Sequence, residues 1–314
     1  VKYFEKPILL YWMNAASFMA LGENEFAARF PTALSGVLGA LVTALLCSAV
    51  FGRRAGAIAG AVTALSLLYF AIGTITLTDM PLSLFLTAAL SAFYYGHIKN
   101  DRRWFLAFYA SVALGLLAKG LIAIVLPGGI IFWYIIFTKK WRLILDALYL
   151  PGIALFFLIA FPWFYMVSRE NPDFLYFFFV REHFLRYATK IHSRYEPFWF
   201  FIPMIPVGLL PWTGFFFSLF SRESVLRSPD DKNVKDANIY LLCWFTVIFA
   251  FFSFSSSKLI PYIVPCFPPL AILIASDFDR MIERGKWHGK VLAFSLVFGG
   301  LFSAALIVYS FVGG

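Results

Sequence analysis

The sequence predicts an all-α protein, a polytopic bundle of membrane-spanning helices, from three observations. Of 314 residues, 61% are hydrophobic and 14% are charged, whereas soluble domains are near half apolar and a quarter charged. The mean hydropathy is +0.80. The apolar residues fall in runs whose lengths are close to the roughly 20 residues that a helix needs to cross about 30 Å of hydrocarbon. No hydrophilic stretch could fold as a soluble domain, so we expect residues 1–314 to form a single membrane module.

About ten apolar runs are candidate spans. They lie near residues 30–51, 56–75, 80–97, 104–118, 120–138, 144–167, 198–220, 237–254, 259–276 and 290–312. If the chain crosses the membrane at each run, its connections alternate between the two sides. The long connection at 168–197 is rich in Phe, Tyr, Arg, Glu and His. This composition favours an interfacial segment with short helices over a free linker.

The connections on one side, at 52–54, 97–103, 138–142, 221–236 and 279–290, are basic. They hold 16 of the 26 Lys and Arg residues, namely Arg53, Arg54, Lys99, Arg102, Arg103, Lys139, Lys140, Arg142, Arg222, Arg227, Lys232, Lys235, Arg280, Arg284, Lys286 and Lys290. By the positive-inside rule these loops are cytoplasmic. The net charge of +9 is therefore placed as in a membrane protein, and no nucleic acid partner is expected.

The start of the chain and the three cysteines add two further expectations. The sequence begins at Val1, and the first charged cluster already belongs to the outer side. We therefore expect Val1 to lie in mid-loop, after at least one helix that this sequence lacks. Cys47, Cys243 and Cys266 lie in apolar runs without metal-site spacing, which predicts buried thiols.

Charged residues on the outer side form five clusters at helix ends or in loops. These are residues 3–7, 77–81, 118–120, 181–187 with 194–197, and 257–262. Ionisable groups at membrane depth are costly unless paired, so their concentration on one side indicates function. Lys6, Lys119, Arg186 and Lys258 could instead extend toward lipid head groups, a common fate of basic residues at helix ends. A lipid phosphate also needs cations at this depth.

Four of these clusters leave alternatives open. Asp79 follows one span and starts another, so it is a candidate for a helix N-cap as well as for an active site. Lys119 and Gly120 could form only a tight connection. Glu5 and His183 could ligate a divalent metal. Alternatively, Glu5 pairs with Lys6 or Arg29, and His183 with Glu182 or Glu196.

Taken in order, these clusters resemble the aminoarabinose transferase and protein O-mannosyltransferase type of membrane glycosyltransferase, which has the GT-C fold. The resemblance runs over nearly the whole chain. It is carried by TyrPheGluLysPro at 3–7 with IleLeuLeuTyrTrp at 8–12, GlyGluAsnGluPheAlaAlaArgPhePro at 22–31, GlyArgArg at 52–54, LeuThrAspMetPro at 77–81, AlaLysGly at 118–120, GluHisPheLeuArgTyr at 182–187, GluProPheTrp at 196–199 and SerLysLeuIleProTyrIleValPro at 257–265.

The resemblance implies an inverting transferase in the bacterial inner membrane, with its active site facing the periplasm or exterior. The donor it implies is a polyprenyl phosphate-linked sugar, usually on undecaprenyl phosphate, and the acceptor is lipid A, another glycan or a protein. The family's proposed general base is the principal acidic residue. It is expected upstream of Val1, in a stretch that this sequence lacks. The C-terminal soluble domain of some members is also absent from it.

By carry-over onto matching positions, the resemblance assigns roles to eight residues. It implies that Glu5 and His183 hold a divalent metal (zinc, magnesium or manganese). Lys6 and Arg186, and with them Lys258 and Tyr262, are implied to face the donor phosphate. Asp79 and Lys119 are implied to be catalytic. The alternative class is a polytopic transporter or lipid flippase, in which polar groups and broken helices lie near the bilayer midplane. A surface-polysaccharide polymerase or ligase would share the lipid donor.

Overall fold

The computed structural model describes residues 5–185, 196–221, 224–227 and 231–285, together with residues 289, 293, 295, 297 and 298. This part of the chain is helical and contains no strand. Its elements are α1 (Leu9–Leu21), α2 (Glu25–Phe51), α3 (Arg53–Leu65), α4 (Leu67–Gly73), α5 (Asp79–Lys99), α6 (Trp104–Lys119), α7 (Ile122–Thr138), α8 (Arg142–Ala147), α9 (Leu150–Glu170), the π-helix η1 (Tyr176–Leu185), α11 (Phe201–Gly208), α12 (Thr213–Ser218), α13 (Lys232–Phe254), the 3₁₀-helix η2 (Ile260–Cys266) and α14 (Phe267–Arg284).

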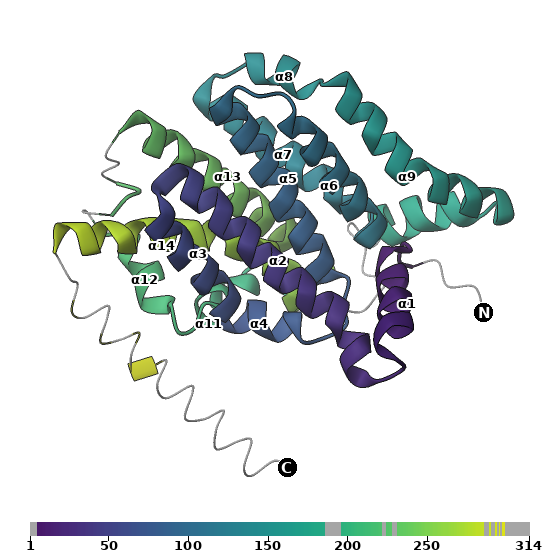
Figure 1. The fold of residues 1–314 in the computed structure, drawn as a ribbon, viewed down its shortest axis with the longest axis horizontal. Coiled ribbons are helices and arrows are strands. Elements are labelled where there is room, and N and C mark those ends of the chain that lie inside the picture. The colour runs from purple at the N-terminus through teal and green to yellow at the C-terminus, as the bar shows by residue number, and fades with distance from the viewer. Residues whose placement is uncertain are drawn as a thin grey trace, which may run out of the picture.

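The bundle is built around α5 and the continuous segment η2–α14. Helix α5 contacts α2, α6, α7 and η2, while α14 packs against α3, α2 and α13 (Figure 1). In the apolar stretch of Ile260–Arg284, 89% of the residues are buried, against 11% in α9. Helix α9 lies at the edge on α6 and presents Leu150, Phe157 and Leu158 outward. An apolar face of this kind indicates contact with lipid.

Within the described part of the chain, four helices are long and apolar enough to cross a membrane, namely α2, α9, α13 and η2–α14. The bent pair α3 and α4 is a possible fifth, and α1, α6 and α7 are shorter apolar helices. The expected total of ten spans remains a prediction, since residues 290–312 fall almost wholly outside the described part of the chain. The outer connection at 168–197 contains a short helix, η1, as expected, and α1 precedes α2 on the same side. Their position at the membrane interface remains a prediction.

Two of the expected continuous spans are broken. The span at 56–75 divides at Ser66 into α3 and α4, which meet at 63°. The span at 198–220 divides into α11 and α12. The two breaks meet, because the Leu67 N–H donates to the Leu210 carbonyl at 3.0 Å. A backbone donor freed by one break thus bonds to an acceptor freed by the other, as buried peptide groups require.

One end of the bundle gathers the basic loops, and we call it the basic end. There Arg54 at the start of α3 forms ion pairs with Asp279 and Glu283 of α14. Arg102 pairs with Asp146 of α8 at 2.5 Å. Figure 1 shows α8 and α1 at opposite ends of the molecule. We call the end that carries α1 and the start of α5 the outer end.

Candidate active site

Asp79 and Lys119 form an ion pair at the outer end. Asp79 is the first residue of α5 and Lys119 is the last residue of α6. The Lys119 amine donates to a carboxylate oxygen of Asp79 at 2.5 Å, and the two side chains are only 11% and 10% exposed. Asp79 is not the helix N-cap, because Thr78 occupies that position. A carboxylate and an amine removed from water in this way attract each other more strongly than a pair at the surface does.

The Lys119 amine also lies over the ring of Tyr262, with 4.4 Å between the nitrogen and the ring centroid. Tyr262 belongs to η2, so this contact joins a third segment to the pair. A cation over an aromatic face is attracted by the negative charge of the ring face. The predicted site residues Asp79, Lys119 and Tyr262 therefore lie together, although 183 positions separate the first from the last.

A positive φ angle explains how Lys119 reaches this position. Gly120 ends α6 with a φ angle of 115°, which side-chain-bearing residues rarely adopt. The chain can therefore reverse at once into α7, which begins at Ile122. The sequence AlaLysGly forms the tight connection expected as one alternative. In the same turn it presents the lysine to Asp79.

Lys258 is close to Tyr262 in the sequence and lies in the loop between α13 and η2. Its amine donates to the backbone carbonyls of Ser255 at 2.7 Å and Glu196 at 2.8 Å, and the residue is 5% exposed. Burial lowers the pKa of the amine, while the negative charge of Glu196 opposes this shift. Lys258 thus ties the segment before α11 to the loop that leads into η2. Its role in phosphate binding remains a prediction.

The first loop places Glu5 and Lys6 just before α1, and both residues are partly buried. Arg29, one of the alternative partners of Glu5, forms an ion pair with Glu25 at 3.6 Å. The proposed contact of Lys6 with the donor phosphate remains a prediction.

Three of the sequence-based assignments fall outside what the structure describes. They concern the side chain of His183, the whole of Arg186, and Val1. The Glu5–His183 metal site and the Arg186 phosphate contact therefore remain predictions. The acidic general base implied by the family resemblance likewise remains a prediction.

Among the described residues, no three His, Cys, Asp or Glu side chains gather into a metal-binding group. The donor set predicted from the sequence, one carboxylate and one imidazole, is of a kind that zinc accepts. Cys47, Cys243 and Cys266 are free and buried, as expected for structural thiols.

Comparisons with known proteins show which family the chain resembles. Residues 5–166, just over half of the chain, match the family described as dolichyl-phosphate-mannose-protein mannosyltransferase. The undecaprenyl phosphate-alpha-4-amino-4-deoxy-L-arabinose arabinosyl transferase 1 of Proteus mirabilis is 35% identical over 99% of this chain. The corresponding transferase of Aeromonas salmonicida is 32% identical over 91% of it.

The fold is shared with a solved structure. The crystal structure of ArnT from Cupriavidus metallidurans bound to undecaprenyl phosphate has a TM-score of 0.85 and 32% identity, and the match covers 99% of this chain. The same protein in its apo state has a TM-score of 0.83. The chain spans about half the length of these relatives: 56% and 52% of the two transferases and 55% of the ArnT chain. With this helical fold and the match over residues 5–166, the chain belongs to the dolichyl-phosphate-mannose-protein mannosyltransferase family, and within it the chain is similar to the aminoarabinose transferases named above.

Proposed function

We propose that this protein transfers a sugar, 4-amino-4-deoxy-L-arabinose, from undecaprenyl phosphate to lipid A at the outer face of the bacterial inner membrane. The observation that carries the proposal is the Lys119 amine, held between the Asp79 carboxylate and the Tyr262 ring at the outer end. The similarity to a structure bound to undecaprenyl phosphate, over nearly the whole chain, supports the choice of lipid donor.

In this reaction an oxygen of the acceptor attacks the anomeric carbon of the sugar. The bond from that carbon to the phosphate oxygen breaks, and its electron pair leaves with undecaprenyl phosphate, so the configuration at the carbon inverts. Negative charge grows on the departing phosphate oxygen. Preorganised cations near that oxygen stabilise the transition state, usually the largest contribution that such a site makes.

The site residues have different roles in this reaction. Lys6 and Arg186 bind the phosphate by charge-assisted hydrogen bonds, and Lys119 adds positive charge. Asp79 holds the Lys119 amine in place, which fixes its direction. The phenolic O–H of Tyr262 is a neutral donor. When the acceptor is a hydroxyl, a carboxylate must also take its proton, and the family resemblance assigns that role to an acidic residue upstream of the first residue of this chain.

A divalent metal held by Glu5 and His183 belongs to the same proposal. A carboxylate oxygen and an imidazole nitrogen are ordinary zinc ligands, at about 2.0–2.2 Å from the ion. The chemistry that the ion supplies when bound is charge stabilisation on an oxygen of the substrate. Removing the metal with a chelator and restoring it ion by ion tests this part separately.

The direct test uses the full-length protein in liposomes, with a radiolabelled sugar on undecaprenyl phosphate and lipid A as the acceptor. We expect the label to move onto lipid A, and the Lys119→Met variant to transfer it at least about tenfold more slowly. Movement of the intact donor across the bilayer without transfer would establish the transporter or flippase class instead. Transfer to a glycan but not to lipid A would correct the acceptor.

A further inference from the structure

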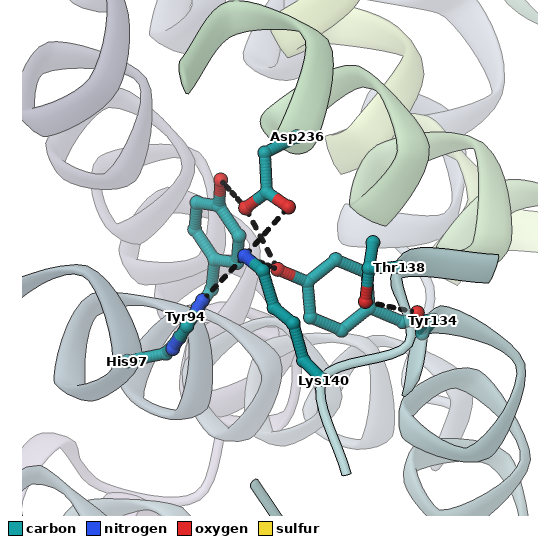
Figure 2. Close-up of polar contacts among 6 residues, drawn as sticks. All are labelled: Tyr94, His97, Tyr134, Thr138, Lys140 and Asp236. Atoms are coloured by element: carbon teal, nitrogen blue, oxygen red, sulfur yellow. Dashed lines mark hydrogen bonds and ion pairs between the residues drawn. The ribbon is translucent and has the colours of Figure 1, made fainter. Parts of the chain in front are cut away.

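Five side chains at the basic end form a polar network outside the candidate active site. They are Tyr94 and His97 of α5, Tyr134 of α7, Lys140 just after α7, and Asp236 of α13 (Figure 2). The Asp236 carboxylate accepts from the Tyr134 hydroxyl at 2.7 Å, the Tyr94 hydroxyl at 3.2 Å and the Lys140 amine at 2.7 Å. Three segments of the bundle thus converge on one carboxylate.

The network is balanced in charge. The Lys140 amine donates to Asp236, to the Tyr134 hydroxyl at 3.0 Å and to Nε2 of His97 at 2.8 Å. A lysine can only donate, so Nε2 must accept, and we assign a neutral imidazole with its proton on Nδ1. One cation therefore faces one anion. All three N–H bonds of the amine are used.

A stacked pair of aromatic rings packs against the network. The rings of Tyr94 and Tyr240 are stacked with 4.5 Å between their centroids. Tyr240 is fully buried and donates its hydroxyl to the Leu90 carbonyl of α5 at 2.7 Å. Helices α5 and α13 are thereby joined by stacked rings as well as by hydrogen bonds. Stacked aromatic pairs stabilise a contact beyond the area that they bury.

The same segments lead to the candidate active site at their other ends. Asp79 is the first residue of α5, at the end away from Tyr94 and His97. Lys119 precedes α7 by the single tight turn at Gly120. The loop that holds Lys258 and leads to Tyr262 follows directly after α13. Each helix therefore carries the network near one end, and a site residue lies at the other end of the helix or in the segment joined to that end by a short connection.

We infer that this network is a positioning device, which fixes α5, α7 and α13 against one another so that Asp79, Lys119 and Tyr262 remain in contact at the opposite end. The inference rests on the proposed transferase function. It predicts a specific kinetic signature. Misplacing a catalytic group by about 1 Å can cost a hundredfold in rate. Donor binding should suffer less, because Lys6, a proposed phosphate ligand, precedes α1 and does not belong to these three helices.

The Asp236→Asn variant of the full-length protein tests the inference. We expect kcat to fall about tenfold, while the Kd for undecaprenyl phosphate rises by a clearly smaller factor than the fall in kcat. Asp146→Asn is the matched control, because Asp146 also pairs with a basic residue at the basic end and its side chain is 21% exposed, against 19% for Asp236. This control should keep the wild-type kcat. Tyr134→Phe, which loses one hydroxyl, is the milder test variant if Asp236→Asn fails to fold.

A distance measurement separates this inference from the proposed function. Spin labels at Thr74, shortly before α5, and at Phe254, the last residue of α13, report on the outer end, where both positions are exposed. We expect a narrow distance distribution in the wild type and in Asp146→Asn, and a broader one in Asp236→Asn and Tyr134→Phe. An unchanged width in both test variants would overturn the inference. The inference would also be overturned if the fraction of protein able to bind the donor fell as much as the activity did, because both losses would then be due to unfolding. Broadening in a protein that transfers no sugar would refute only the proposed function.

Discussion

At the scale of single residues, the Lys119 amine is held by two kinds of contact, a carboxylate and an aromatic face. The pair with Asp79 is largely removed from water, so removing one partner leaves an uncompensated charge. We expect Asp79→Asn to cost about 3 kcal/mol of unfolding free energy. The double variant Asp79→Asn with Lys119→Met should recover part of that loss. Denaturant unfolding in detergent measures both, and additive losses in the double variant would contradict the coupling.

Two substitutions at Tyr262 separate its ring from its hydroxyl. Tyr262→Phe keeps the face that Lys119 contacts and removes only the O–H. If the O–H binds the donor phosphate, the affinity for undecaprenyl phosphate should fall by about 0.5–1.5 kcal/mol. Tyr262→Leu also removes the cation–π contact, which contributes about 0.5–2 kcal/mol, so this variant should be less stable as well. Equal donor affinity in Tyr262→Phe and the wild type would leave the ring as the functional part.

Lys6 and Arg186 are predicted to bind the donor phosphate. Losing a charge-assisted hydrogen bond costs about 1.5–3 kcal/mol, so Lys6→Ala and Arg186→Ala should each weaken donor use by about tenfold or more. Arg53→Ala is the control because this arginine is exposed at the basic end. The neighbouring Arg54 serves less well, since it binds Asp279 and Glu283. Equal losses in all three variants, measured as kcat/KM for the donor, would point to general destabilisation.

At the scale of helices, small residues set how closely α2 and α3 approach. A Cβ atom added at Gly56 of α3 would lie 2.7 Å from the Ala44 backbone carbonyl of α2. Backbone cannot yield as a flexible side chain can, so Gly56→Ala should destabilise the protein by about 1–3 kcal/mol. Gly128→Ala in α7 is the control, because nothing lies within 4 Å of its added Cβ. A lower midpoint of thermal unfolding for Gly56→Ala alone would confirm the close packing.

The helices show how far the sequence could predict the fold. The apolar runs predicted the helical class and most of the elements, because hydropathy reports directly on contact with lipid. Hydropathy could not predict the bend at Ser66, since α3 and α4 belong to one apolar run. The Leu67 N–H at the bend bonds to Leu210, which is distant in the sequence. Asp79, Lys119 and Tyr262 could be selected as charged or polar groups at helix ends on one side. Their mutual contacts depend on packing that one sequence does not reveal.

The polar network at the basic end was missed for a related reason. Tyr94 and Tyr134 lie inside apolar runs, where a tyrosine resembles any other aromatic residue of a membrane helix. Their partner Asp236 is 142 and 102 positions away in the sequence. Asp236 and Lys140 were also assigned to basic loops, where charged side chains are expected to be exposed to water rather than paired. The sequence signal that could have indicated this network is the occurrence of several polar residues together at the end of an otherwise apolar helix.

At the scale of the whole molecule, the orientation in the membrane can be tested with single cysteines. The basic loops predict that Arg103 is cytoplasmic, whereas Glu23, between α1 and α2, is on the outer side. Both positions are exposed, and the three native thiols are buried. A membrane-impermeant maleimide added to intact cells should therefore label Glu23→Cys and leave Arg103→Cys unlabelled. The reverse pattern would invert the topology.

The tight turn at Gly120 has a consequence for the bilayer itself. Helices α6 and α7, which the turn joins, have 16 and 17 residues, so they extend only about 24–26 Å. The hydrocarbon layer is about 30 Å thick. This hydrophobic mismatch makes the surrounding lipid thin by several ångströms, or leaves the Lys119 amine below the level of the head groups. A lipid phosphate that reaches the amine at that depth is no longer surrounded by water. Away from water, the attraction between opposite charges is several times stronger than in bulk solvent.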